Sequence, residues 1–187
     1  SLIVADPREI DILNTPRAKA GSHLPLRPGT NVAFINAMAY TIIDEGLEDK
    51  PFIAERCESP AFEKWKVFIM ENKNSPEVSA GITGINATKL RQAARDYATA
   101  GNWAIYCGLW VTEHSQGSTM VMGIANLAML TGNIGREGVG VNPLRGQNNV
   151  QGACDMGSFP HELPGYRSVS DNQVRAEFEQ AWGVTLQ

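Results

Sequence analysis

The sequence predicts an α/β fold that contains part of a doubly wound, Rossmann-like sheet in a three-layer αβα arrangement. Two short apolar runs, Leu2–Ala5 and Trp103–Cys107, are typical of strands that are buried on both faces. An apolar helical pattern over residues 31–43 separates them. Because two strands, or three if Ser22–Leu26 is counted, are too few for a complete sheet, we expect a portion of a larger α/β protein.

Apolar spacing and end signals predict the helices. In the helix at residues 31–43 the apolar residues occupy most of the circumference, so we expect it to be largely buried, and Gly46 supplies its end. Four further helices are predicted. One carries Phe62, Trp65 and Ile69 at helical spacing, and a second covers Ala87–Tyr97 after the cap residue Asn86. The last two cover about residues 118–130 and 171–182.

The composition indicates a soluble protein that does not bind nucleic acid. The chain has 187 residues, enough for one domain or a little more, and 16 basic against 20 acidic residues give a net charge of −4. A nucleic-acid-binding domain usually carries a basic face. No run approaches the roughly 18 consecutive apolar residues that a membrane helix needs, so we expect no membrane contact.

The cysteines predict neither a disulfide framework nor a metal site within the chain. Cys57, Cys107 and Cys154 lie far apart and form no C-x-x-C pair, which favours a reducing, cytoplasmic compartment. The sequence starts with a strand pattern instead of a signal peptide, and it lacks an initiator Met. We therefore expect a piece of a longer polypeptide.

Two polar segments follow the two predicted strands. Asp6-Pro7-Arg8 comes directly after the first, and the loop from Gly108 to Gly117, with the donors Thr112, His114 and Gln116, follows the second. If the strands are parallel, both segments lie at the sheet edge where ligands of α/β proteins bind. The alternatives are a helix cap with a turn at Asp6 and a plain strand-to-helix turn at Gly108.

A third segment, Arg145–Gln151, is dense in hydrogen-bond donors. It combines an arginine and a glycine with four side-chain amides, a set suited to a carboxylate, a phosphate or a polar heterocycle. A solvated loop is the alternative. Because so many amides are costly to bury without partners, the pattern favours a functional site. It lies in the glycine- and amide-rich stretch from Thr131 to Gly152, which contains little that could form a core.

The same region identifies a family. Gly140–Gly157, which reads GVNPLRGQNNVQGACDMG, closely resembles the signature of formate dehydrogenase large (alpha) subunits in the molybdopterin oxidoreductase family. Thr112–Met122 is most similar to the soluble, NAD-linked bacterial branch, although Trp110 stands where the family usually has Gly-Met-Gly. The resemblance extends over effectively the whole chain, through Leu2–Arg8, Leu26–Asn31, Leu127–Gly135, Pro164–Tyr166 and Ala181–Val184.

The resemblance implies a cofactor, a domain division and a set of roles. Family members hold molybdenum or tungsten between two molybdopterin guanine dinucleotides, and residues 1–147 would form part of the domain that binds one of them. Residues 148–187 would begin the adjacent domain. Asp6 would engage the guanosine end, and Arg145 would hold the carboxylate of formate as the catalytic residue. The cofactor-binding residues would be Asp6, Arg8, Gly108, Thr112, His114, Gln116, Gly117, Gly146 and Gln147.

The implied reaction is the oxidation of formate to carbon dioxide, with two electrons entering the metal centre. The cysteine or selenocysteine that binds the metal, the iron–sulfur cluster and any NAD site would lie elsewhere in the full enzyme. The isolated chain is therefore expected to be inactive. Its partners would be formate, the remaining domains of the same subunit, and iron–sulfur or flavin electron-transfer subunits.

Two interpretations from other functional classes are alternatives to a fragment of an oxidoreductase. The chain could be a non-catalytic module that binds guanine nucleotides at the same sheet edge without turning them over. Alternatively, it could be a structural segment whose glycine-rich loop docks to a partner, although the donor density around Arg145 speaks against that role.

Overall fold

The protein is described by a computed structural model that covers residues 1–19 and 21–186. Contacts divide it into two units, Ser1–Leu144 and Arg145–Gln187, hereafter unit 1 and unit 2. This division falls near the predicted domain boundary at 147/148, which remains a prediction because compact units need not coincide with domains of a longer chain. Each unit is described by itself.

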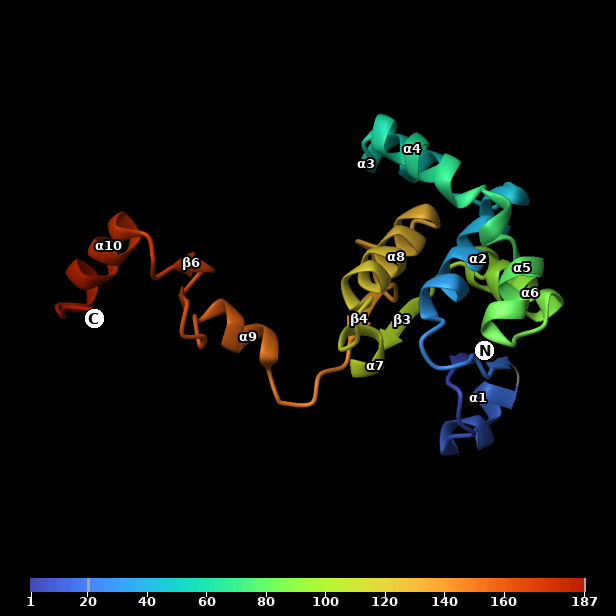
Figure 1. The fold of residues 1–187 in the computed structure, drawn as a ribbon, viewed down its shortest axis with the longest axis horizontal. Coiled ribbons are helices and arrows are strands. Elements are labelled where there is room, and N and C mark those ends of the chain that lie inside the picture. Colours follow the sequence, from blue (N-terminus) through green and yellow to red (C-terminus); the bar gives the residue numbers. More distant parts are fainter. Residues whose placement is uncertain (20, 187) are drawn as a thin grey trace. The chain divides into compact units, whose positions relative to one another are not determined.

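Unit 1 mixes helices with short strands (Figure 1). Its elements are β1 (Ile3–Ala5), the 3-10 helix η1 (Asp11–Asn14), α1 (Pro16–Lys19), β2 (Ser22–Leu24), α2 (Asn31–Asp44), α3 (Lys50–Arg56), α4 (Ser59–Ile69), the 3-10 helix η2 (Asn72–Asn74), α5 (Pro76–Thr83), α6 (Ala87–Thr99), β3 (Ala104–Cys107), α7 (Leu109–Thr112), α8 (Gly117–Leu130) and β4 (Gly140–Pro143).

The strands of unit 1 form two separate parallel pairs. β1 pairs with β2, with Val4 opposite His23, and β3 pairs with β4, with Ile105 opposite Val141. All three predicted strands are therefore present, and β4 is an addition within the stretch that we expected to contribute little to a core. Its sequence, Gly-Val-Asn-Pro, has no strand periodicity, so only the tertiary pairing with β3 reveals it.

The prediction that β1 and β3 are buried on both faces is wrong for the described residues. Ala5 is exposed in β1, and Tyr106 in β3 is 66% exposed. An apolar run shows that a strand can be buried but not which neighbours cover it. The faces of a strand are buried by the elements that pack above and below its sheet, and the strand's own sequence does not record those elements.

The core of unit 1 is organised around α2, which contacts α5, α6 and α8 (Figure 1). The prediction that this helix is largely buried is confirmed: eight of its residues are buried, and Thr41 and Ile42 are fully so. The Thr41 hydroxyl donates to the carbonyl of Ala37 at 2.9 Å, so this buried polar group is satisfied within the helix. Fully burying an Ile contributes about 1.5–3 kcal/mol.

Local end signals set the helix boundaries as predicted. The Asn86 side chain accepts from the backbone N–H of Thr88 at 2.8 Å at the start of α6, and α8 begins at Gly117 and ends at Leu130. The Asn86 cap supplies an acceptor to a backbone N–H that has no partner inside the helix.

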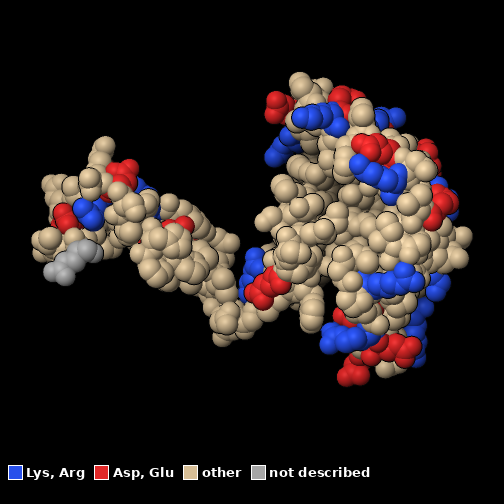
Figure 2. Space-filling model, viewed as in Figure 1, with Lys and Arg blue, Asp and Glu red and all other residues tan. Residues whose placement is uncertain are grey.

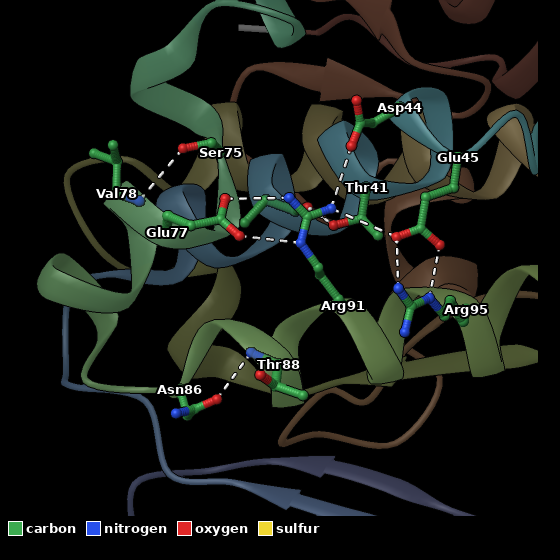
Figure 3. Close-up of polar contacts among 11 residues, drawn as sticks. Thr41, Asp44, Glu45, Ser75, Glu77, Val78, Asn86, Thr88, Arg91 and Arg95 are labelled. Carbon is green, nitrogen blue, oxygen red and sulfur yellow. Dashed lines mark hydrogen bonds and ion pairs between the residues drawn. The ribbon is translucent and has the colours of Figure 1, made fainter.

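Ion pairs tie the polar faces of α2, α5 and α6 together on the surface of this core (Figure 3). Arg91 on α6 reaches Glu77 on α5 at 3.1 Å, and also Asp44 and Glu45 at the end of α2 at 3.3 and 3.5 Å. Arg95 lies 2.7 Å from Glu45. Hydrogen bonds from these arginines lower the pKa of both Glu45 and Glu77, so the two carboxyls stay ionised at neutral pH.

Unit 2 is small and has little apolar interior. It contains α9 (Val150–Asp155), an antiparallel pair formed by β5 (Glu162–Leu163) and β6 (Arg167–Ser168), and α10 (Asn172–Trp182). The helix predicted over about 171–182 is present as α10, and the carboxylate of Asp171 caps it by accepting from the N–H groups of Gln173 and Val174. Only Leu163 and Val174 among its apolar residues are buried in the described part of this unit.

Charged side chains are unevenly distributed over unit 1 (Figure 2). They gather over α3 and α4 and over the N-terminal region around α1, among other places, whereas the fourteen residues of α8 include none. Val121 and Met122 on α8 are 43% and 58% exposed. Within residues 1–19 and 21–186, no helix combines the length and the apolarity needed to cross a bilayer.

We predict that Arg91→Met lowers the free energy of unfolding by about 1 kcal/mol, because one guanidinium serves three carboxylates from two other helices. Chemical denaturation at pH 7 measures it, with the exposed Lys89→Met on the same helix as the control. Glu45 and Glu77 have lowered pKa values, so their contribution is present above the ordinary Glu pKa and lost as pH falls through the folded-state values. The difference between variant and parent should therefore shrink in acid, and a difference that grows would contradict the prediction.

Candidate functional site

Unit 1 contains a cleft of about 430 Å³ that is lined by residues of both β1 and β3. Residues after both strands line it, namely Asp6 and Arg8 after β1 and Gly108 and Trp110 after β3. The structure thus brings together two of the three segments that the sequence singles out, even though β1 and β3 belong to different pairs.

The segment that follows β3 contacts the first turn of α2. Asn31 begins α2, shortly after the end of β2, and its side-chain amide donates to the carbonyl of Trp110 at 3.4 Å. The same amide nitrogen lies 3.2 Å from Nε2 of His114. Because Trp110 and His114 come shortly after β3, these contacts place the end of β3 beside the segment that follows the end of β2. Sequence reasoning missed these contacts of Asn31, because an asparagine at the start of a helix indicates only a helix cap.

Asp6 is held in a tight local turn by Arg8. Its Oδ1 accepts from the backbone N–H of Arg8 at 2.8 Å and from Nε at 3.1 Å, and Oδ2 accepts from Nη2 at 3.3 Å. The expected alternative of a helix cap is not what forms, because the next helix, η1, has Ile10 at its cap position. Hydrogen bonding to the Arg8 side chain lowers the pKa of Asp6, which is 23% exposed and remains a carboxylate at neutral pH.

The loop after β3 is folded into the short helix α7 and a turn that leads to α8. The Nδ1 atom of His114 accepts from the backbone N–H of Gln116 at 3.2 Å, which orients the imidazole toward Asn31. Thr112 and His114 are partly buried, and Gln116 is exposed. The cleft lining includes Gly108 but not Thr112, His114, Gln116 or Gly117.

The two glycines that bound this loop differ in what they permit. A Cβ atom at Gly117 would collide with the backbone carbonyl of Thr112, so the turn closes only around a glycine. A Cβ atom at Gly108 would meet nothing within 4 Å. The space beside Gly108 is therefore open, and no atom of the chain would contact a side chain placed there.

The third predicted segment lies in unit 2, where residues 145–149 are all exposed. Arg145, Gly146 and Gln147 precede α9 and are thus presented to the surroundings of that unit. Asn149 has a left-handed backbone with φ of 52°, and its side chain caps α9 by accepting from Gly152 N–H at 3.2 Å. A Cβ atom at Gly152 would collide with this amide, so the helix cap accounts for the glycine.

A second amide of the segment is also occupied within unit 2. Nε2 of Gln151 donates to Oδ1 of Asp155 at 2.9 Å and lies 2.8 Å from the Tyr166 hydroxyl, which itself donates to Asp155 at 2.6 Å. Hydrogen bonds from Tyr166 and Gln151 lower the pKa of Asp155. Tyr166 has φ of 61°, an unusual backbone for a non-glycine residue. Sequence reasoning missed this cluster, although the spacing of four residues between Gln151 and Asp155 could have indicated that pair.

Comparisons with known proteins agree with the motifs. The profile of the molybdopterin oxidoreductase family matches residues 1–182. The chain is 48% identical over 183 residues to formate dehydrogenase H of Escherichia coli (strain K12), covering 98% of this chain and 24% of that protein. It is 46% identical to the F420-dependent formate dehydrogenase subunit alpha of Methanocaldococcus jannaschii, covering 99% of this chain and 26% of that one. The chain therefore spans about a quarter of these relatives.

A solved structure is similar in fold as well. Acetylene hydratase from Pelobacter acetylenicus aligns with a TM-score of 0.65 and 28% sequence identity, over 73% of this chain and 18% of that one. The chain therefore resembles a member of known structure in its fold as well as in its sequence.

We predict that Gly117→Ala destabilises the chain by about 1–3 kcal/mol, because the added methyl group collides with backbone and not with a movable side chain. Gly108→Ala is the matched control, since its methyl group enters open space and should change stability by less than about 0.5 kcal/mol. Denaturant melts of both variants measure the difference. Equal destabilisation by the two substitutions would show that the turn does not close as described.

Proposed function

Because this chain belongs to the molybdopterin oxidoreductase family, we propose that it is part of a formate dehydrogenase catalytic subunit. The full subunit would oxidise formate to carbon dioxide at a molybdenum or tungsten centre held by two molybdopterin guanine dinucleotides. Support comes from the motif around Arg145 and from the identity to formate dehydrogenases over almost the whole chain. Unit 1 would then be part of a Rossmann-like dinucleotide-binding domain, with the boundary to the next domain near residues 147 and 148.

The observation that carries the proposal is the cleft that gathers Asp6, Arg8 and Gly108 at the carboxyl ends of two parallel strand pairs. In α/β proteins ligands bind at this edge. A carboxylate offers about four acceptor positions, and Arg8 uses three of them, so Asp6 can still accept from the donor edge of guanine. The residues present thus fit the guanosine end of the dinucleotide.

The segment after β3 fits the phosphate and pterin side. Gly108 leaves room for close approach, and the described residues provide no side-chain cap to the first turn of α8. The N–H groups of such a turn attract anions. Thr112, His114, Gln116 and Gly117 would line the approach, with the His114 imidazole oriented by Asn31.

Arg145 would bind formate. A guanidinium is always charged and presents a planar fork of donors, which matches a carboxylate in a bidentate arrangement. When bound, the metal cofactor supplies the two-electron redox chemistry, and the protein contributes position and electrostatics. Gly146 and Gln147, which follow in the exposed segment, would pack near the metal centre or the pterin.

The remaining partners follow from the same proposal. Formate would be the substrate, and the other domains of the subunit would supply the metal ligand and an iron–sulfur cluster. Electron-transfer subunits with iron–sulfur or flavin groups would accept the electrons. Three of the matched relatives are F420-dependent by name, so NAD linkage stays a prediction. A cytoplasmic location is likewise a prediction.

We predict that Arg145→Lys in the full-length enzyme lowers kcat/KM for formate by about 30- to 1,000-fold, which corresponds to about 2–4 kcal/mol of lost transition-state stabilisation. The lysine keeps the charge but not the fork. Steady-state kinetics with formate and an artificial electron acceptor measure the effect, alongside metal content to show that the cofactor is retained. Arg175→Lys on α10 is the control, and unchanged kinetics for Arg145→Lys would refute the carboxylate-binding role.

A second candidate function is a guanine-nucleotide-binding module without catalysis. The observation that favours it is that the whole cleft lies within unit 1 and needs nothing from unit 2.

Calorimetry of the 187-residue chain with GDP separates the two functions. We predict no measurable heat at submillimolar GDP and no formate-dependent dye reduction, because the dinucleotide site needs the rest of the subunit. Micromolar binding of GDP would instead support the binding module.

A further inference from the structure

His23 on β2 holds the backbone of the turn that carries Asp6. Its Nε2 atom lies 2.9 Å from the carbonyl oxygen of Asp6, and the two residues are 17 positions apart in the sequence. A carbonyl oxygen can only accept a hydrogen bond, so Nε2 carries the hydrogen and donates it. The histidine is partly buried and stands opposite Val4, two residues before Asp6, in the strand pair. The turn is therefore held from the neighbouring strand.

The bond from His23 complements the contacts between Asp6 and Arg8. The Arg8 contacts lie within the turn, and they fix the carboxylate of Asp6 relative to the Arg8 side chain. They do not tie the turn to the sheet, because both residues belong to the turn and the Arg8 side chain is 69% exposed. The bond from His23 supplies this second constraint, since it joins the turn to β2.

The backbone of Asp6 has little freedom once its carbonyl group is held. Pro7 follows Asp6, and the residue before a proline is restricted to extended backbone conformations. Within that range, the bond from His23 selects the direction of the carbonyl group. The carbonyl group and the side chain are attached to the same Cα atom. Fixing the one therefore fixes the direction in which the other leaves the backbone.

β2 is itself anchored where the chain continues beyond it. The backbone N–H of Arg27 donates to the carbonyl of Thr83, and its Nη1 donates to the carbonyl of Gly81, both at 2.8 Å. These carbonyls lie at the end of α5, where the last turn of a helix leaves acceptors unused and attracts cations. Because α5 packs against α2, the support of Asp6 runs from the core through β2 to His23.

The direction of the Asp6 carboxylate matters because Arg8 leaves it about one free acceptor position. Recognition of a guanine donor then depends on where that position points. We propose that His23 is a positioning residue for Asp6, whose carboxylate it aims at the guanine end of the cofactor through the bond to the Asp6 carbonyl. The inference rests on the proposed function, in which Asp6 engages that end.

Nucleotide release from the purified full-length enzyme tests the proposal. The enzyme is incubated in sub-denaturing urea, released cofactor is separated by ultrafiltration, and its guanine nucleotide is measured by chromatography after acid hydrolysis. We expect His23→Leu to release the nucleotide about tenfold faster than the parent, the effect of losing about one hydrogen bond. His23→Gln should release it at close to the parent rate, because the glutamine amide can donate from nearly the position of Nε2.

A double-mutant cycle shows whether His23 acts through Asp6. Asp6→Ala should release the nucleotide at least as fast as His23→Leu, and the double variant should release it no faster than Asp6→Ala. Additive effects would overturn the proposal, as would a parent-like rate for His23→Leu beside fast release by Asp6→Ala. Both results leave the guanosine role of Asp6 intact. A parent-like rate for Asp6→Ala would instead refute that role, and the inference with it.

Arg91→Met is the control for stability. The ion pairs of Arg91 join α6 to α2 and α5, so this variant should weaken the fold in urea without faster nucleotide release. If Arg91→Met speeds release as much as His23→Leu does, the effect arises from general loosening of unit 1 and the proposal is wrong. The readout is nucleotide release, which requires no formate turnover.

Discussion

Burial of α2 is the constraint on which the rest of unit 1 depends. Helices α5, α6 and α8 pack against it, and its fully buried Ile42 lies in the continuous core. Because α2 is apolar around most of its circumference, it is stable only when it is enclosed by other elements. The ion pairs of Arg91 and Arg95 then fix the polar edges of α5 and α6 against the end of the same helix.

The start of α2 links this core to the candidate site. Asn31 at its first turn holds the segment after β3 through the carbonyl of Trp110 and the imidazole of His114. The polar mouth of the cleft is therefore supported by a helix whose own position is set by the core. This is the arrangement that precise ligand binding requires, since groups on rigid elements keep their geometry better than groups on free loops.

Glycines and amides in the recognised motifs serve the fold as well as a ligand. Gly117 permits a turn that any side chain would obstruct, and Gly152 makes room for the cap formed by Asn149. Gln151 is held by Asp155 and Tyr166. In contrast, a Cβ atom at Gly108 would meet nothing within 4 Å, so the local turn does not account for this glycine.

The sequence by itself determined the family, the presence of helices α2, α4, α6, α8 and α10, and the Asn86 cap, because motifs, apolar periodicity and capping act over a few neighbouring residues. Only the tertiary structure decided that the strands form two separate pairs, that β4 joins β3, and that Asn31 supports the loop at His114. It also showed Tyr106 exposed in a strand that its composition predicts to be buried. Pairing and coverage depend on residues distant in the chain, and apolar composition records only that a strand can be covered, not whether its neighbour is present.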